Sequence, residues 1–308
     1  MRIVYPIVAL SLLLTVACDT NTEEVNTAGV SLDLVFEQEM EELTQIQPTR
    51  QSSDNNDDMY DQRYIIRVYN VDKDDFIIGD CVAERIVCSE QIDRPNRLGE
   101  VIELPEGRYR IYAWSDYVDN GSVEDKFYET EDFNQIEIKR DDSGALMIGN
   151  NDFHKAYCGS CYVDVSGEGR TKAQIDMKCP QAKVNIVITG LRETFATRAD
   201  NQSLASLKVQ IRYNGFRPSV YSVFSDAPID AVASVAFMSS VGEIDGDSAC
   251  IGFDYLFVGS INYAILMTVN IFDKNNKLIH SCANIKVPIQ RNHITTVSGN
   301  FLSNSSGE

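Results

Sequence analysis

Residues 101–114 read Val101-Ile102-Glu103-Leu104-Pro105-Glu106-Gly107-Arg108-Tyr109-Arg110-Ile111-Tyr112-Ala113-Trp114. Two runs rich in β-branched and aromatic residues flank a Pro-Glu-Gly turn, and this pattern predicts a β-hairpin. Trp114 closes the second run. A tryptophan in an alternating strand is typical of a core anchor, because its burial removes a large apolar area from water. The stretch therefore indicates an antiparallel sheet with a covered face.

Short alternating segments of the same kind recur on both sides of this hairpin, and helical periodicity is scarce. Residues 191–195 are the best helix candidate, and the polar stretch 38–61 ends as an exposed loop. We therefore predict an all-β chain with two antiparallel β-sandwich domains, residues 28–179 and 180–308. Beyond the hairpin, strands are expected at residues 30–36, 64–69, 76–78, 136–138, 173–177, 183–188, 207–211, 220–224, 231–237, 253–258, 263–272, 285–289 and 295–302.

The N-terminus has the pattern of an export signal. A positive start, Met1-Arg2, precedes an apolar run over residues 3–17. This run is shorter than the roughly 20 apolar residues of a membrane-spanning helix, so it predicts a signal peptide, residues 1–17. It ends in Thr15-Val16-Ala17-Cys18, which resembles a bacterial lipobox with Thr15 where Leu is usual.

We expect cleavage between Ala17 and Cys18 and a lipid, such as palmitate, on Cys18. Residues 18–27 would form a lipidated tether, and the rest of the chain would be soluble outside the cytoplasm. The alternative is an ordinary cleaved signal, in which Cys18 is a bystander.

Composition restricts the partners. The formal net charge is −19, which repels nucleic acid and anionic headgroups, so no nucleic-acid partner is expected. Apart from Cys18, the chain has seven cysteines: Cys81, Cys88, Cys158, Cys161, Cys179, Cys250 and Cys282. Seven cannot all pair within one chain. Either one thiol stays free and buried, or selection for disulfides is weak.

Few groups of residues in the sequence have the spacing of a catalytic, cofactor or metal site. The three histidines form no zinc-helix motif, and neither a nucleophile elbow nor a phosphate loop is present, so we predict no catalytic residue, no cofactor and no enzyme activity. Cys158-Gly159-Ser160-Cys161 has the spacing of a redox pair or a zinc half-site. It lacks a βαβ context and a second Cys/His pair, so we expect a local disulfide or two reduced thiols in a β-rich loop.

Two acidic clusters are candidate calcium sites. They comprise Asp116, Asp119, Asn120 and Asp125 in one loop, and Glu243, Asp245 and Asp247 in another. Neither has the spacing of an EF-hand loop, so both are predicted to be solvated loops and no metal site is expected.

Three stretches together resemble the fimbrillin-like lipoproteins of type V pili, most closely the fimbrial anchor subunits. They are Leu104-Pro105-Glu106-Gly107-Arg108-Tyr109-Arg110-Ile111-Tyr112-Ala113-Trp114-Ser115-Asp116, Pro180-Gln181-Ala182-Lys183-Val184-Asn185-Ile186-Val187-Ile188-Thr189-Gly190-Leu191, and Val287-Pro288-Ile289-Gln290-Arg291-Asn292-His293-Ile294-Thr295-Thr296-Val297-Ser298-Gly299-Asn300-Phe301-Leu302.

The resemblance implies two transthyretin-like β-sandwiches and contacts with other pilin subunits by β-strand addition. It also implies a place on the surface of the outer membrane, held there by the lipid. In the family, an anchor keeps its N-terminal strand, here residues 30–36. A shaft or tip subunit loses that strand by proteolysis at a basic residue, for which Arg50 is the candidate.

The predicted function is thus that of a structural, adhesive pilus component. The alternative is a surface glycan-binding lipoprotein without catalytic activity, which would use exposed aromatic residues such as Tyr117 or Tyr221. A third alternative, a secreted hydrolase, lacks a nucleophile or metal constellation.

Overall fold

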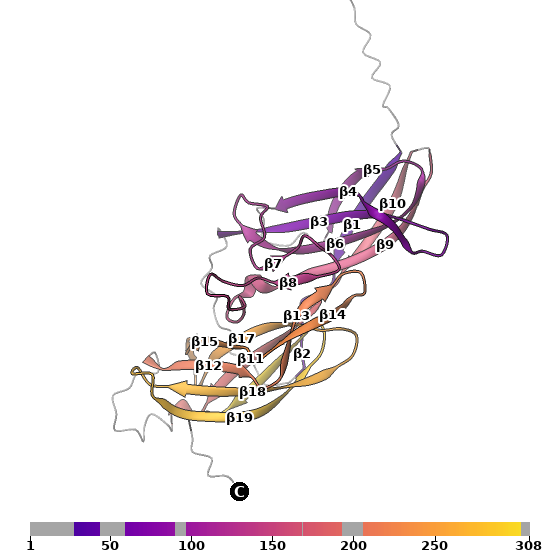
Figure 1. Ribbon diagram of the computed structural model, residues 1–308. Helices are drawn as coiled ribbons and strands as arrows, with labels where there is room; N and C mark the ends of the chain where they lie inside the picture. Colours follow the sequence, from indigo (N-terminus) through magenta and orange to yellow (C-terminus); the bar gives the residue numbers. More distant parts are fainter. Residues whose placement is uncertain (1–27, 44–58, 90–96, 168, 193–205, 303–308) are drawn as a thin grey trace, which may run out of the picture.

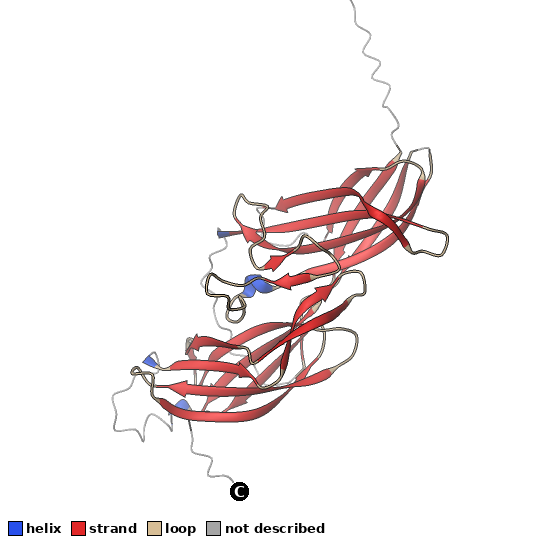
Figure 2. Ribbon diagram, viewed as in Figure 1, coloured by secondary structure: helices blue, strands red, loops and turns tan. Residues whose placement is uncertain are grey.

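The computed structural model describes residues 28–43, 59–89, 97–167, 169–192 and 206–302. These residues form two β-sandwiches, one above the other in Figure 1, and almost all regular structure is strand (Figure 2). The predicted all-β sandwich fold is therefore confirmed. A one-turn 3-10 helix, η2 (Asp152–His154), lies near the junction of the sandwiches.

The first sandwich packs a four-stranded sheet against a three-stranded sheet. Side chains alternate along each strand, so every second residue enters the core; Tyr64, Ile66 and Val68 of one strand are all 0% exposed. In spatial order, the larger sheet contains β4 (Ile77–Ser89), β3 (Tyr60–Val71), β6 (Gly107–Asp119) and β9 (Tyr157–Val165), and the smaller contains β10 (Arg170–Met177), β1 (Gly29–Phe36) and β5 (Arg97–Glu103).

The second sandwich packs a five-stranded sheet against a four-stranded sheet. Its core is mostly aliphatic, and Val209, Ile188 and Val269 are each 0% exposed. The first sheet contains β16 (Ile244–Asp245), β17 (Ser248–Phe257), β11 (Gln181–Thr189), β20 (His293–Gly299) and β2 (Glu41–Glu42), and the second contains β15 (Ala236–Ser240), β12 (Lys208–Tyr213), β18 (Tyr263–Phe272) and β19 (Leu278–Ile289).

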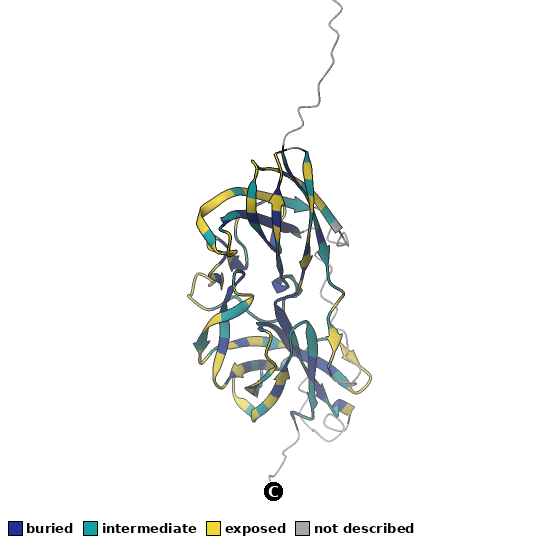
Figure 3. Cartoon of the chain, turned by 90° about the vertical axis from the view of Figure 1, so that its right-hand side faces the viewer, coloured by how far each residue is buried: buried dark blue, intermediate teal, exposed yellow. Residues whose placement is uncertain are grey.

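A fifth sheet joins the two sandwiches. It contains β14 (Ala227–Ala233), β13 (Phe216–Ser222), β8 (Ile136–Ile138) and β7 (Tyr128–Glu129), so two strands come from each half of the chain. Beside it lies an aromatic core around Trp114, which is 0% exposed, as predicted for a core anchor. The Trp114 ring meets Tyr128 at 5.5 Å and Phe257 of the second sandwich at 6.5 Å between centroids. Buried residues follow the inner faces of both sandwiches and continue through this junction (Figure 3).

The N-terminal segment, residues 28–43, belongs to both sandwiches. Its strand β1 lies in the first, and its strand β2 pairs parallel with β20 in the second. The β1–β10 and β11–β20 pairs are also parallel, whereas the other pairs are antiparallel. The domain boundary between residues 179 and 180 stays a prediction, because β2 and the joining sheet bring residues from both sides of it together.

Candidate functional site

The first part of the candidate site is the position of β1 between β5 and β10, here called the β1 slot. This strand pairs parallel with β10, from Gly29↔Arg170 to Phe36↔Met177, and antiparallel with β5, from Gly29↔Glu103. Three of its alternate side chains, Val30, Leu32 and Leu34, are 0% exposed. Burying each of them stabilises the fold by roughly 1.5–3 kcal/mol. A short N-terminal strand therefore completes both the sheet and the core of the first sandwich.

At Gly29, the first residue of β1, the strand lies very close to the main chain of β5. A Cβ at Gly29 would lie 2.5 Å from the main-chain oxygen of Ile102. Real Cβ contacts are not this short, so glycine is required for β1 to approach β5 here. This close approach determines where the strand can begin.

The second part is the acidic connector, residues 37–42, which crosses from one sandwich to the other. The Glu37 carboxylate accepts a hydrogen bond from the Cys179 main-chain N–H. Glu39 accepts from Lys155 Nζ at 3.1 Å, and the Glu41 N–H donates to the Asn292 carbonyl at 3.3 Å. The connector is thus held by groups from both halves of the chain.

The third part is the polar cluster beside that connector. Asp226 accepts hydrogen bonds from Tyr221 Oη at 2.6 Å and from Arg291 Nη1 at 2.8 Å. Burial works in the opposite direction, but these two donors hold the pKa of Asp226 below its usual range. Arg291 Nε also donates to the Cys179 carbonyl at 2.9 Å. The cluster therefore links the turn between β13 and β14 to Cys179, at the predicted domain boundary.

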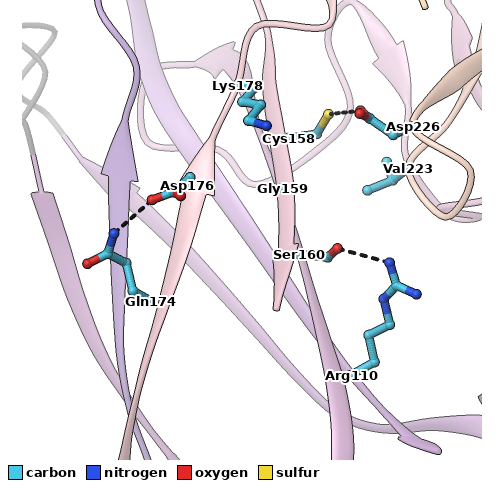
Figure 4. Close-up of a pocket in the computed structure, with 9 residues that line it drawn as sticks. All are labelled: Arg110, Cys158, Gly159, Ser160, Gln174, Asp176, Lys178, Val223 and Asp226. Atoms are coloured by element: carbon cyan, nitrogen blue, oxygen red, sulfur yellow. Dashed lines mark hydrogen bonds between the residues drawn. The ribbon is translucent and has the colours of Figure 1, made fainter. Parts of the chain in front are cut away.

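Two cavities open at this cluster and share Lys178 and Asp226. One has a volume of about 300 Å³ and lies between β9 and β10 (Figure 4). There Arg110 Nη2 donates to Ser160 Oγ at 3.3 Å. The other, of about 630 Å³, lies against the acidic connector. No Phe, Tyr or Trp side chain is among the residues that line either cavity.

The residues named for the glycan-binding alternative do not reach a surface. Tyr117 is 5% exposed and Tyr221 is 0% exposed. Tyr221 packs on Phe257 in the aromatic core at the junction, at 5.2 Å between centroids. The expectation that these two rings are exposed was wrong, because both lie where the sandwiches meet. No sugar can stack on them in this fold.

The paired cysteines lie on a strand, where a β-rich loop was expected. Cys158 and Cys161 are both in β9. Residues three apart in a strand are separated by about 10 Å, whereas a disulfide needs Cα atoms within about 7 Å. Both thiols are free, and burial raises the pKa of Cys158 to about 12 and that of Cys161 to about 11. Neither is a reactive thiolate near neutral pH.

The acidic residues of the first calcium candidate are engaged by cations. Asp116 is buried and accepts from Arg63 Nε at 2.9 Å and from Arg63 Nη2 at 2.7 Å. Asp125 lies 2.8 Å from the same guanidinium, and Asp119 lies 2.8 Å from Lys126 Nζ. The prediction that Asp116 lies in a solvated loop was therefore wrong, because Asp116 forms a buried ion pair with Arg63. Within the described residues, no group of three or more Cys, His, Asp or Glu side chains is placed to hold a metal ion.

Three predicted site residues, Ala17, Cys18 and Arg50, lie outside the described residues, and their roles stay predictions. No helix within the described ranges is both long and apolar enough to cross a membrane. The sequence reasoning missed the acidic connector and Asp226. The alternation of carboxylates at 37, 39 and 41 was the available signal, but a run with Met40 as its single apolar residue is also typical of an exposed loop.

Solved structures of similar proteins support the fold. A candidate polysaccharide-binding protein (DUF1812) from Bacteroides thetaiotaomicron VPI-5482 has a TM-score of 0.50 and 12% identity, with 82% of this chain and 80% of that chain covered. A candidate adhesin from the same strain has a TM-score of 0.49 and 14% identity, with 89% and 93% covered. The fimbrial anchor protein Mfa2 from Porphyromonas gingivalis has a TM-score of 0.43 and 11% identity, with 83% and 82% covered.

At these sequence identities, similarity to a solved structure is evidence for the fold alone. That evidence comes from the polysaccharide-binding protein, whose TM-score is 0.50. One fimbrial anchor protein is among the similar structures. None of the three is named as an enzyme. The comparison with curated proteins gives no match. Residues 21–308 match the family described as "Family of unknown function (DUF6562)".

Proposed function

The chain belongs to this family of unknown function, and from that premise we propose that it is a structural lipoprotein of the cell surface. It is tethered to the outer membrane by a lipid on Cys18 and binds pilus subunits by strand addition. The observation that carries the proposal is β1, an N-terminal strand that completes a sheet between two strands remote from it in sequence. A strand of this kind is the element that strand-addition assemblies exchange.

Two further features support this function. The motifs of the hairpin, of the strand that begins after Pro180 and of the C-terminal stretch resemble those of fimbrial anchor subunits. The lipobox-like sequence at Cys18 precedes β1 by only a short tether, which suits a protein that keeps its N-terminal strand and holds the base of a fibre. The anchor role requires that the mature chain retains this strand, whereas a shaft role would require cleavage at Arg50.

The experiment is to replace Cys18 by serine in the bacterium that makes the protein. We expect C18S to move the chain from the membrane fraction to the soluble fraction and to release fibres into the medium. Cys81→Ser is the matched control, because Cys81 is an exposed thiol and its loss should leave both distributions unchanged.

Membrane retention of the C18S chain would contradict lipid attachment at this residue. Loss of the chain from the membrane without any change in the fibres would contradict the anchor role. It would then favour the glycan-binding alternative.

A further inference from the structure

The cavity of about 300 Å³ between β9 and β10 is lined by an arginine that has no carboxylate partner among the described residues. We propose that this cavity binds a sugar acid, a small hydroxylated molecule that carries one carboxylate. Arg110 binds the carboxylate, and Lys178 and Asp176 bind hydroxyl groups. The inference goes beyond the proposed function and does not depend on strand addition, because no residue of β1 lines the cavity and the β1 slot stays filled.

Arg110 differs from the other arginines that are shielded from water. Among the side chains whose burial the structure describes, five arginines are buried or half-buried: Arg63, Arg67, Arg110, Arg217 and Arg291. Four of them lie 3.0 Å or less from a carboxylate oxygen. Arg110 is the exception, in a chain whose formal net charge is −19. An anion from outside the chain would give it the partner that the other four have.

The contacts of Arg110 hold its guanidinium in place but leave donors free. Nη1 donates to Tyr162 Oη at 2.5 Å and Nη2 donates to Ser160 Oγ at 3.3 Å, so both acceptors are neutral. The guanidinium carbon lies 4.5 Å from the centroid of the Tyr162 ring and 4.9 Å from that of the Tyr112 ring. Nε is buried and has no hydrogen-bond partner within the described part of the chain. Since a guanidinium has five N–H donors in a planar fork, the free ones suit a carboxylate.

The rest of the lining selects a single negative charge. Lys178 adds a second cation, and Asp176 and Asp226 add two carboxylates. Arg291 neutralises Asp226, whereas Asp176 accepts from Gln174 Nε2 at 2.7 Å and forms no ion pair among the described residues. A dianion such as phosphate would be repelled by Asp176, because like charges at short range are unfavourable. A single carboxylate at the Arg110 end avoids this repulsion.

The same lining favours hydroxyl groups on the ligand. A hydroxyl both donates and accepts, so it can donate to the Asp176 carboxylate and accept from the Lys178 ammonium. Figure 4 shows Asp176 and Lys178 at one end of the cavity and Arg110 at the other, with Ser160 between them. A hexuronic acid has its carboxylate and its ring hydroxyls at opposite ends in the same way. The volume is at the lower end of the roughly 300–1,000 Å³ that small-molecule sites occupy.

The cavity also joins the two halves of the chain. Arg110 and Ser160 belong to the first sandwich, whereas Val223 and Asp226 lie in the turn between β13 and β14. A ligand that contacts both sides binds the folded chain and not the unfolded one. Binding should therefore raise the unfolding temperature, which provides a second readout besides affinity.

The test is calorimetric titration of the purified mature chain with D-glucuronate, D-glucose, acetate and inorganic phosphate. We expect glucuronate to bind and to raise the unfolding temperature. Glucose lacks the carboxylate and acetate lacks the hydroxyls, so each should bind at least about tenfold more weakly, since hydrogen bonds to charged groups are the strong ones. Phosphate should also bind more weakly than glucuronate.

Variants assign the binding to this cavity. Arg110→Met should weaken glucuronate binding about tenfold, because it removes the donor group for the carboxylate. Lys178→Met should weaken it about threefold, since this side chain is exposed and its contact is screened by water. Arg212→Met is the matched control, because Arg212 is an exposed arginine on β12 of the second sandwich, and it should leave the affinity unchanged.

Absence of glucuronate binding would overturn the inference. Equal binding of glucose or acetate, or tighter binding of phosphate, would contradict a sugar acid as the ligand. An affinity for glucuronate that is unchanged in Arg110→Met would show that it binds elsewhere. If Arg110→Met does not fold, Lys178→Met decides, and an unchanged affinity in that variant has the same meaning. None of these outcomes depends on the distribution of the C18S chain, so the inference and the proposed function can fail separately.

Discussion

Single buried polar residues hold the junction together. The Asp254 carboxylate, 1% exposed, accepts from Tyr213 Oη at 2.5 Å and from Arg217 Nε at 3.0 Å. Its second oxygen accepts from the Gly149 N–H at 3.0 Å and from the Tyr255 N–H at 2.9 Å. Because Gly149 precedes β11 and the other donors follow it, this one carboxylate links both halves of the chain. Removing one partner of such a buried pair is strongly destabilising, because the remaining charge is left unneutralised.

His154 makes the stability of the junction depend on pH. Its ring packs on Phe127 at 4.7 Å between centroids, and burial lowers its pKa to about 4. In the unfolded chain the pKa of histidine is about 6.5. Between these values the unfolded state binds the proton and the folded state does not, so the contribution of His154 is complete above about pH 6.5 and is lost as the pH falls toward 4.

We therefore expect the free energy of unfolding to fall by about 2 kcal/mol between pH 7 and pH 5 on account of this residue. Urea unfolding of His154→Gln at both pH values checks this expectation, because the variant should lose that part of the pH dependence. His280→Gln is the control. An unchanged pH dependence in His154→Gln would show that the histidine does not act in this way.

At the scale of elements, β9 explains why the Cys-x-x-Cys sequence is inert. The strand holds Cys158 at 2% exposure, while the raised pKa of both thiols keeps them protonated near neutral pH. Cys81, on the edge strand β4, is exposed. The reactivity of these thiols should therefore follow strand position and burial, not sequence spacing.

The matching prediction is that a thiol reagent at pH 8 modifies Cys81 of the native protein well before Cys158. Peptide mass spectrometry over a time course, with the urea-unfolded chain as the reference for equal reactivity, measures the order. A disulfide between Cys158 and Cys161, or modification of Cys158 as fast as that of Cys81, would contradict the assignment of residues 157–165 to a continuous strand.

Much of the fold could be predicted, because strand periodicity is a local signal. Residues 30–36 and 183–188 alternate clearly, and they form β1 and β11. β9 was missed because the glycine and serine between its cysteines have low strand propensity, and only its long-range pairing with β6 makes it a strand. The connector was missed for a related reason, since its acidic residues gain their role only from groups more than 100 residues away.

At the scale of the whole molecule, three connections tie the sandwiches into one body: the N-terminal segment, the joining sheet and the aromatic core around Trp114. A load applied at the N-terminus would pass through β1 to both neighbouring strands and through β2 to the second sandwich. Such an arrangement suits a protein that holds a fibre at a membrane, because no single linker carries the load. An anchor of this design must keep residues 28–43.

The mature N-terminus is the most direct measurement of this account. Mass spectrometry would be applied to the chain from membranes and from purified surface fibres. We predict a lipid-modified Cys18 as the first residue, in a chain recovered at fibre bases with β1 still attached. A chain that begins at Gln51 within the fibres would contradict the account, because it would have lost both the lipid and the strand on which the anchor role depends.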